Sequence, residues 1–223
     1  MQNTLIVANW KSNKTISEGL KWIEDFAKDF KENEEKEVIL CPSFTLIYPL
    51  KAAIADRNIN IKLGAQDVSL FPEGAYTGEV NSKQIKELAD YVIIGHSERR
   101  ENFKEDNEIL FEKVKRAQEA SLAPIFCVQD ENTKIPEGNI IIAYEPSSSI
   151  STSGPSAEAD DPQNANRIAL LFKSKNPASV FLYGGSVSGE NVGSFTKQEG
   201  IGGILVGGKS LSALEFLKIY ENS

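Results

Sequence analysis

The only histidine of the 223-residue chain, His96, lies where a run of apolar residues meets a cluster of charged ones. The apolar run covers residues 91–95, and Glu98, Arg99 and Arg100 follow the histidine closely. Imidazole is well suited to proton transfer near neutral pH, so His96 is a candidate for acid–base chemistry. A single histidine behind an apolar run is more often structural, and its neighbours in space decide between these two interpretations.

Other chemically useful groups also stand directly behind apolar runs. Asn9 and Lys11 follow the first run, Glu145 ends the sixth, and glycine-rich turns at residues 184–186 and 207–208 close the seventh and eighth. Taken singly, a lysine is usually solvated, a glutamate before proline ends a strand, and glycine pairs mark turns. Together, an ammonium, an imidazole, a carboxylate and two turns with accessible backbone could transfer protons on a phosphorylated carbonyl compound with neither metal nor cofactor.

These groups can act together only if the apolar runs are parallel strands of one sheet. The eight runs cover residues 4–9, 37–42, 60–65, 91–95, 123–128, 140–145, 179–184 and 202–207. Most are apolar without alternation, which is typical of parallel strands buried on both faces. Stretches with helical spacing separate them, at residues 16–30, 46–55, 107–120, 164–174 and 213–220. The first of these helices is predicted to begin with a capping box formed by Thr15 and Glu18.

Strands that alternate with helices over this length predict an α/β protein, a single (β/α)8 barrel domain spanning residues 1–223. The functional face of such a barrel lies at the C-terminal ends of its strands, which is where the candidate residues stand. One connection, residues 129–139, is too short for a full crossover helix and contains Pro136 and Gly138. We therefore expect helix 5 to be absent or much shortened.

Composition excludes several classes of function. A net charge of −8 argues against a nucleic-acid partner, although a small anionic substrate can still bind in a pocket of locally opposite field. Cys41 and Cys127 lie in apolar runs without the spacing of metal ligands, and they are expected to be buried free thiols in a reducing compartment; one disulfide stays open as an alternative. With neither a signal peptide nor a long apolar run, we expect a cytoplasmic protein that has no membrane partner.

Six short motifs, in order and across nearly the whole chain, resemble those of the triosephosphate isomerase family. They are ANWK (residues 8–11), GAYTGE (74–79), IIGHSERR (93–100), AYEP (143–146), YGGSV (183–187) and LVGGKSL (205–211). Each is weak evidence alone, whereas all six in the family's order form a specific signal. The resemblance implies a TIM barrel that interconverts dihydroxyacetone phosphate and D-glyceraldehyde 3-phosphate in glycolysis and gluconeogenesis, without a cofactor or metal.

The resemblance also implies a role for each matching residue. Glu145 would be the base that moves a proton between neighbouring carbons, and a neutral His96 would donate a hydrogen bond to the substrate oxygens, as is known for this family. Lys11, aided by Asn9, would stabilise the developing negative charge, and Glu98 would position Lys11. The phosphate would be bound by Lys11 and Asn9 together with Ser151, Ser186, Gly207 and Gly208.

The stretch from Pro146 to Ser156 departs from the family pattern. The family carries a mobile lid at this place. In this chain Ser148 replaces the usual tryptophan of that lid, and Ser151 and Ser153 replace its usual glycines. Closure of such a lid protects the reaction intermediate from water. A catalytically impaired barrel that only binds phosphorylated metabolites is therefore the alternative function. An enzyme acting on a larger sugar phosphate is disfavoured by the complete Asn-Lys-His-Glu set.

Assembly is indicated by the loop from Phe71 to Val80. In the family, the corresponding loop inserts into a neighbouring subunit beside its lysine and histidine, so the resemblance implies a homodimer. An ordinary surface loop is the simpler alternative, and the missing helix leaves a higher oligomer open as a third.

Overall fold

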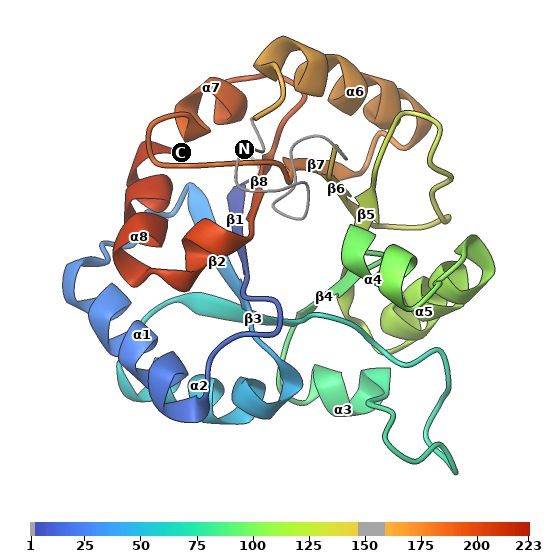
Figure 1. The fold of residues 1–223 in the computed structure, drawn as a ribbon, viewed down its shortest axis with the longest axis horizontal. Helices are drawn as coiled ribbons and strands as arrows, with labels where there is room; N and C mark the ends of the chain where they lie inside the picture. Colours follow the sequence, from blue (N-terminus) through green and yellow to red (C-terminus); the bar gives the residue numbers. More distant parts are fainter. Residues whose placement is uncertain (1–2, 147–158) are drawn as a thin grey trace.

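Eight parallel strands form a closed barrel in a computed structural model that describes residues 3–146 and 159–223 (Figure 1). The strands are β1 (Thr4–Asn9), β2 (Lys36–Cys41), β3 (Ile61–Ala65), β4 (Tyr91–Ile94), β5 (Ala123–Val128), β6 (Ile141–Tyr144), β7 (Val180–Tyr183) and β8 (Gly203–Val206). Each pairs with its neighbour in sequence, and β8 pairs with β1 to close the ring. The eight predicted strands and the (β/α)8 barrel are thus confirmed.

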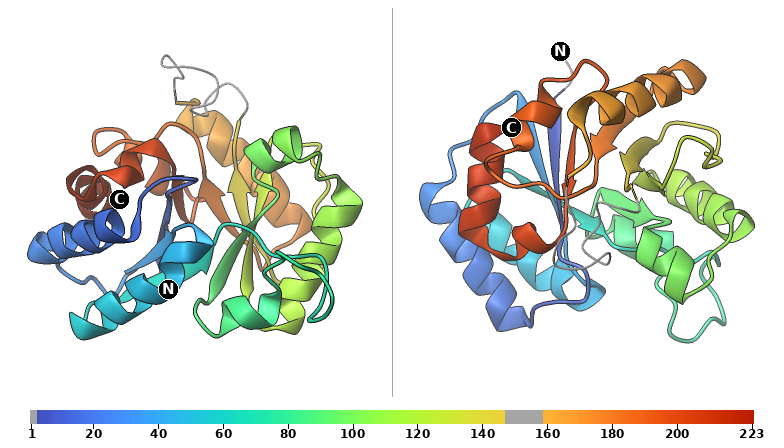
Figure 2. Two further views of the ribbon diagram at one scale, coloured as in Figure 1. Left: turned by 60° about the horizontal axis from the view of Figure 1, so that its bottom comes forward. Right: turned by 45° about the horizontal axis from the view of Figure 1, so that its top comes forward.

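Helices surround the strands on the outside (Figures 1 and 2). They are α1 (Ile16–Asp29), α2 (Phe44–Asp56), α3 (Ser82–Lys86), α4 (Ser97–Asn102), α5 (Asn107–Glu119), α6 (Pro162–Lys175), α7 (Val192–Thr196) and α8 (Ala213–Asn222), with a 3₁₀ turn at η2 (Gly208–Leu211). The predicted capping box is present at the start of α1, where the Thr15 side chain accepts from the Glu18 N–H and the Glu18 carboxylate accepts from the Thr15 N–H. The short helices α3 and α7 were not predicted, because five residues are too few to show a helical period.

No helix forms between β5 and β6, where residues 129–140 run as a loop between α5 and α6 in Figure 1. This confirms the prediction that the fifth crossover helix of the barrel, expected between β5 and β6, is missing. The helix labelled α5 is the crossover between β4 and β5. The loop nevertheless leaves the outer side of these strands covered, since Phe126, Val128 and Ile142 are all fully buried. Phe126 packs against Phe111 of α5, and the Arg100 guanidinium lies 5.5 Å from the centre of its ring. The gap in the helical ring therefore exposes none of these strand residues.

Two apolar clusters hold the barrel together. One fills its interior, with Val7, Ile39, Ile125 and Leu182 among the residues that point inward from the strands. The other is larger and packs the outward residues of the strands against the helices. Within the described residues, no helix has both the length and the apolar character needed to cross a membrane.

Both cysteines lie in the interior cluster as free, fully buried thiols, as predicted. Burial raises the pKa of Cys41, and burial together with the nearby Glu145 carboxylate raises the pKa of Cys127 well above its usual value. In the folded chain both thiols therefore keep their protons at a pH where the unfolded chain loses them.

This difference predicts that the protein becomes less stable at alkaline pH. The contribution is fully present below the unfolded thiol pKa of about 8.5 and is lost as the pH rises above it, at up to about 1.4 kcal/mol per pH unit for each thiol. Urea denaturation between pH 8 and 10 under reducing conditions measures the slope. A Cys41→Ala/Cys127→Ala variant should lose most of it, and an unchanged slope in that variant would show that other groups cause the effect.

Candidate active site

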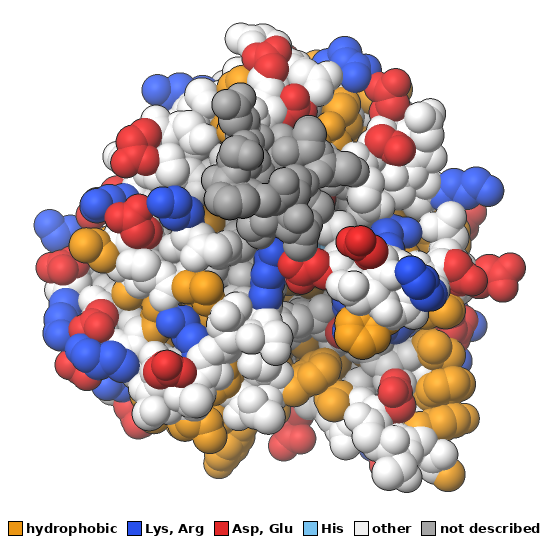
Figure 3. All heavy atoms as spheres, in the orientation of Figure 1, with side chains coloured by type: hydrophobic (Ala, Val, Ile, Leu, Met, Phe, Trp, Pro, Cys, Tyr) orange, Lys and Arg blue, Asp and Glu red, His pale blue; other side chains and the backbone are white. Residues whose placement is uncertain are grey.

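The predicted catalytic residues come together at the C-terminal ends of the strands. Asn9 ends β1 and Lys11 lies two residues later. His96, two residues after the end of β4, is the N-cap residue of α4, and Glu145 follows β6. Asn9, His96 and Glu145 are buried, with 4%, 7% and 1% of their surfaces exposed. At the centre of this face a cationic and an acidic side chain lie side by side (Figure 3).

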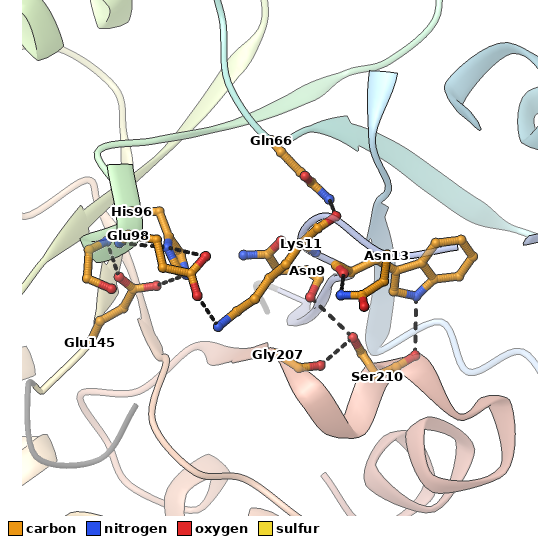
Figure 4. Close-up of polar contacts among 11 residues, drawn as sticks. Asn9, Lys11, Asn13, Gln66, His96, Glu98, Glu145, Gly207 and Ser210 are labelled. Carbon is orange, nitrogen blue, oxygen red and sulfur yellow. Dashed lines mark hydrogen bonds and ion pairs between the residues drawn. The ribbon is translucent and has the colours of Figure 1, made fainter. Parts of the chain in front are cut away.

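Glu145 and His96 are in direct contact. Oε1 of Glu145 lies 3.0 Å from Nε2 of His96, while Oε2 accepts a hydrogen bond of 3.0 Å from the backbone N–H of Ser97 (Figure 4). No hydrogen bond of ordinary geometry reaches Oε1 from the described residues. A buried carboxylate beside an imidazole is suited to accept a proton from a substrate.

The tautomer of His96 follows from its role as the helix cap. Its Nδ1 accepts a hydrogen bond of 3.3 Å from the Glu98 N–H, in the first turn of α4. That bond requires a lone pair on Nδ1, so the neutral imidazole carries its proton on Nε2, the atom that faces Glu145. The helix that His96 caps, α4, begins at Ser97 and ends at Asn102.

Lys11 bridges from β1 to α4. Its ammonium forms an ion pair of 2.6 Å with Oε1 of Glu98, a contact that is only partly exposed (Figure 4). The backbone of Lys11 has φ = 53°, a left-handed conformation that costs about 1–2 kcal/mol for a residue with a Cβ. The Asn9 side chain stabilises this turn, since its Oδ1 accepts from the Lys11 N–H at 3.0 Å. Asn9 thus holds the backbone of Lys11, and Glu98 holds its ammonium group.

The glycine-rich turns after β7 and β8 lie beside these groups. A Cβ on Gly207 would stand 3.4 Å from Cε of Lys11, so the lysine side chain passes directly over this turn. Gly184 approaches the base from the other side, because a Cβ there would stand 3.1 Å from Cγ of Glu145 and 3.0 Å from the Tyr144 carbonyl oxygen. Only glycine leaves room for this close approach of β7 to β6.

The family model for triosephosphate isomerase matches residues 4–223 of this chain. The chain belongs to the triosephosphate isomerase family. Proteins named triosephosphate isomerase from Dehalococcoides mccartyi (strain CBDB1), Dictyoglomus thermophilum and Aquifex aeolicus are respectively 38%, 38% and 35% identical to it. These alignments cover 98%, 100% and 96% of this chain and 96%, 100% and 97% of the relatives. The expected membership of this family is thus confirmed over nearly the full length.

Gln66 is a residue of this site that the sequence analysis did not predict. Its Nε2 donates to the carbonyl oxygen of Lys11 at 2.9 Å and to that of Cys41 at 2.8 Å (Figure 4). The strained backbone of Lys11 is therefore bonded on both sides, by Asn9 at its N–H and by Gln66 at its carbonyl. Gln66 directly follows β3, so the rule that located the other residues could also have located this one.

The remaining predicted phosphate-binding residues are placed unequally. Gly207 and Gly208 form the start of the turn after β8, and Ser186 follows β7, where its carbonyl accepts from the Asn191 side chain at 3.1 Å. Ser148, Ser151 and Ser153, in the expected lid, lie outside the described residues. Within the described part of the chain, no three His, Cys, Asp or Glu side chains gather in a way that could hold a metal ion.

Proposed function

We propose that this chain interconverts dihydroxyacetone phosphate and D-glyceraldehyde 3-phosphate by proton transfer through an enediolate, as a cytoplasmic enzyme of glycolysis and gluconeogenesis. Membership of the triosephosphate isomerase family supports the reaction. The observation that carries its assignment to particular residues is the contact between the buried carboxylate of Glu145 and the neutral imidazole of His96. A base and a neutral hydrogen-bond donor on adjacent sides of one site are what an aldose–ketose proton shift requires.

In this mechanism Glu145 removes a proton from the carbon next to the substrate carbonyl and returns it to the neighbouring carbon. Nε2–H of His96 donates to the two substrate oxygens in turn as negative charge develops on them. A substrate that touches both groups must separate them, so binding replaces the contact between Glu145 and His96. Lys11, held by Asn9 and Glu98, supplies a fixed positive charge that favours the enediolate.

The phosphate binds, in this proposal, at the turns after β7 and β8. The proposed donors are the backbone N–H groups near Ser186, Gly207 and Gly208. The Lys11 side chain lies beside Gly207, and glycine permits a close approach of the backbone to the ligand. Ser151, outside the described residues, is proposed as a further contact from the lid. Anchoring the phosphate away from the reacting carbons fixes their position relative to Glu145.

The test is conversion of D-glyceraldehyde 3-phosphate by the wild-type chain in heavy water, with a chelator and no added cofactor. We expect turnover, with solvent deuterium incorporated at the carbon that receives the proton. A folded chain that binds inorganic phosphate without turnover would establish the alternative, an impaired barrel that binds phosphorylated metabolites. The missing helix lends that alternative no support, because Phe126, Val128 and Ile142 of the strands beside it are fully buried.

We propose a homodimer formed through the loop from Phe71 to Val80, which projects from the barrel between β3 and α3 (Figures 1 and 2). Phe71 and Tyr76 stack with ring centres 4.3 Å apart and remain 38% and 39% exposed. Such an exposed aromatic pair suits burial in a partner subunit. A higher oligomer formed through the surface between β5 and β6, where the crossover helix is missing, is less favoured. No large exposed hydrophobic residue lies in residues 129–146. Light scattering that shows only monomer at working concentration would contradict the dimer.

A further inference from the structure

The turn after β8 is fixed in place through one residue, Ser210, which is fully buried. Its N–H and its hydroxyl both donate to the carbonyl of Gly207, at 2.9 and 2.6 Å, and the hydroxyl also lies 3.5 Å from the Asn9 carbonyl (Figure 4). These contacts close the turn on itself and leave the carbonyl oxygen of Ser210 to be satisfied from outside it.

Both tryptophans of the chain donate to that oxygen. Nε1 of Trp10 lies 3.2 Å from it and Nε1 of Trp22 lies 3.0 Å from it, and the chain contains no other tryptophan. A carbonyl oxygen has two lone pairs, and the two indole N–H groups occupy both. The peptide unit that follows Ser210 therefore has a fixed orientation. The Lys14 ammonium holds the next carbonyl, that of Leu211, at 2.8 Å.

The direction of the Trp22 indole is set by the core rather than by the turn. Trp22 stacks on Phe26 of the same helix with ring centres 4.9 Å apart and planes inclined by 8°, and it also packs against Phe216 of α8. It meets Trp10 edge to face at 5.2 Å. A rigid aromatic cluster thus presents the Trp22 N–H to the turn. Because packing already fixes the indole, the hydrogen bond to Ser210 costs no further side-chain entropy.

This arrangement connects the turn to the catalytic lysine. Trp10 stands between Asn9 and Lys11 in the chain, and Lys11 passes over Gly207. One carbonyl, held by two indoles, consequently fixes the turn after β8 relative to the segment that carries Lys11. We propose that Trp22 is a positioning residue for phosphate, which acts through Ser210 on the backbone N–H groups of Gly207 and Gly208. This inference rests on the proposed function, since it assumes that the phosphate binds at this turn.

The experiment compares Trp22→Phe with Phe26→Leu in the full chain, by calorimetric titration with inorganic phosphate and by steady-state kinetics. Trp22→Phe removes one donor from Ser210, and we expect phosphate to bind about three- to tenfold more weakly, with KM raised and kcat nearly unchanged. Phe26→Leu disturbs the same aromatic cluster without touching Ser210, so it should lower stability and leave phosphate affinity unchanged. Equal phosphate affinity in wild type and Trp22→Phe, or an equal loss in both variants, would overturn the inference.

A second replacement removes the N–H without changing the shape of the ring. β-(3-benzothienyl)alanine at position 22 has sulfur in place of the indole N–H, so packing is kept and only the hydrogen bond to Ser210 is lost. We expect the same weakening of phosphate binding as in Trp22→Phe, and wild-type affinity in this protein would refute the inference even if Trp22→Phe failed to fold. A wild-type chain that turns over substrate while both replacements bind phosphate normally would overturn this inference alone. Absence of phosphate binding in the wild type would overturn the proposed phosphate site with it.

Discussion

Replacing Glu145 by Asp is expected to lower kcat about a hundredfold or more, because it withdraws the carboxylate by roughly 1 Å from the substrate carbon. Glu145→Gln removes the base altogether and should cost about 10²–10⁴ in kcat. Neither change removes a phosphate contact proposed at Ser186, Gly207 or Gly208, so the affinity for inorganic phosphate should stay within about twofold of wild type. Steady-state kinetics and phosphate titration measure the two effects on the same samples.

A matched control is available on the protein surface. Glu131, in the loop between β5 and β6, forms an exposed ion pair of 2.6 Å with Arg167 of α6. Glu131→Asp makes the same chemical change at a surface residue that has no part in the proposed mechanism. Its kcat should equal that of wild type. If Glu145→Asp kept most of its activity, or if both variants lost activity alike, another group would have to serve as the base.

The barrel could be predicted from the sequence because of how its strands are buried. Parallel strands covered on both faces need apolar residues at nearly every position, and runs of that kind locate each strand to within about two residues. The missing helix was equally predictable, since residues 129–139 cannot span a crossover that contains a full helix. The candidate site then followed from one topological rule, that all parallel strands of a barrel end on the same face.

What the sequence could not supply is the geometry within that face. A motif does not reveal that Lys11 has a positive φ or that Glu145 touches His96, because both depend on contacts between residues far apart in the chain. Gln66 was missed because a glutamine behind an apolar run carries no charge and no acid–base group that would mark it as functional, although its amide bonds two backbone carbonyls and so fixes the position of Lys11. The indole donors of Trp10 and Trp22 look like ordinary core residues in sequence, since their apolar rings explain their burial equally well.

Replacing Lys11 by Met is expected to lower kcat/KM by about 10²–10³, the usual cost of removing one preorganised group that stabilises developing charge. Methionine keeps the Cβ of lysine and an unbranched chain as far as Cε, so the left-handed backbone at φ = 53° and its bonds to Asn9 and Gln66 can persist. The loss therefore measures the ammonium itself. Lys104 is the matched control, because it is an exposed lysine with φ = 57° outside the site, and Lys104→Met should leave kcat/KM unchanged. A Lys11→Met enzyme that kept more than about a tenth of wild-type kcat/KM would show that the lysine charge is not what stabilises the intermediate, and the stabilisation would then have to come from His96 alone.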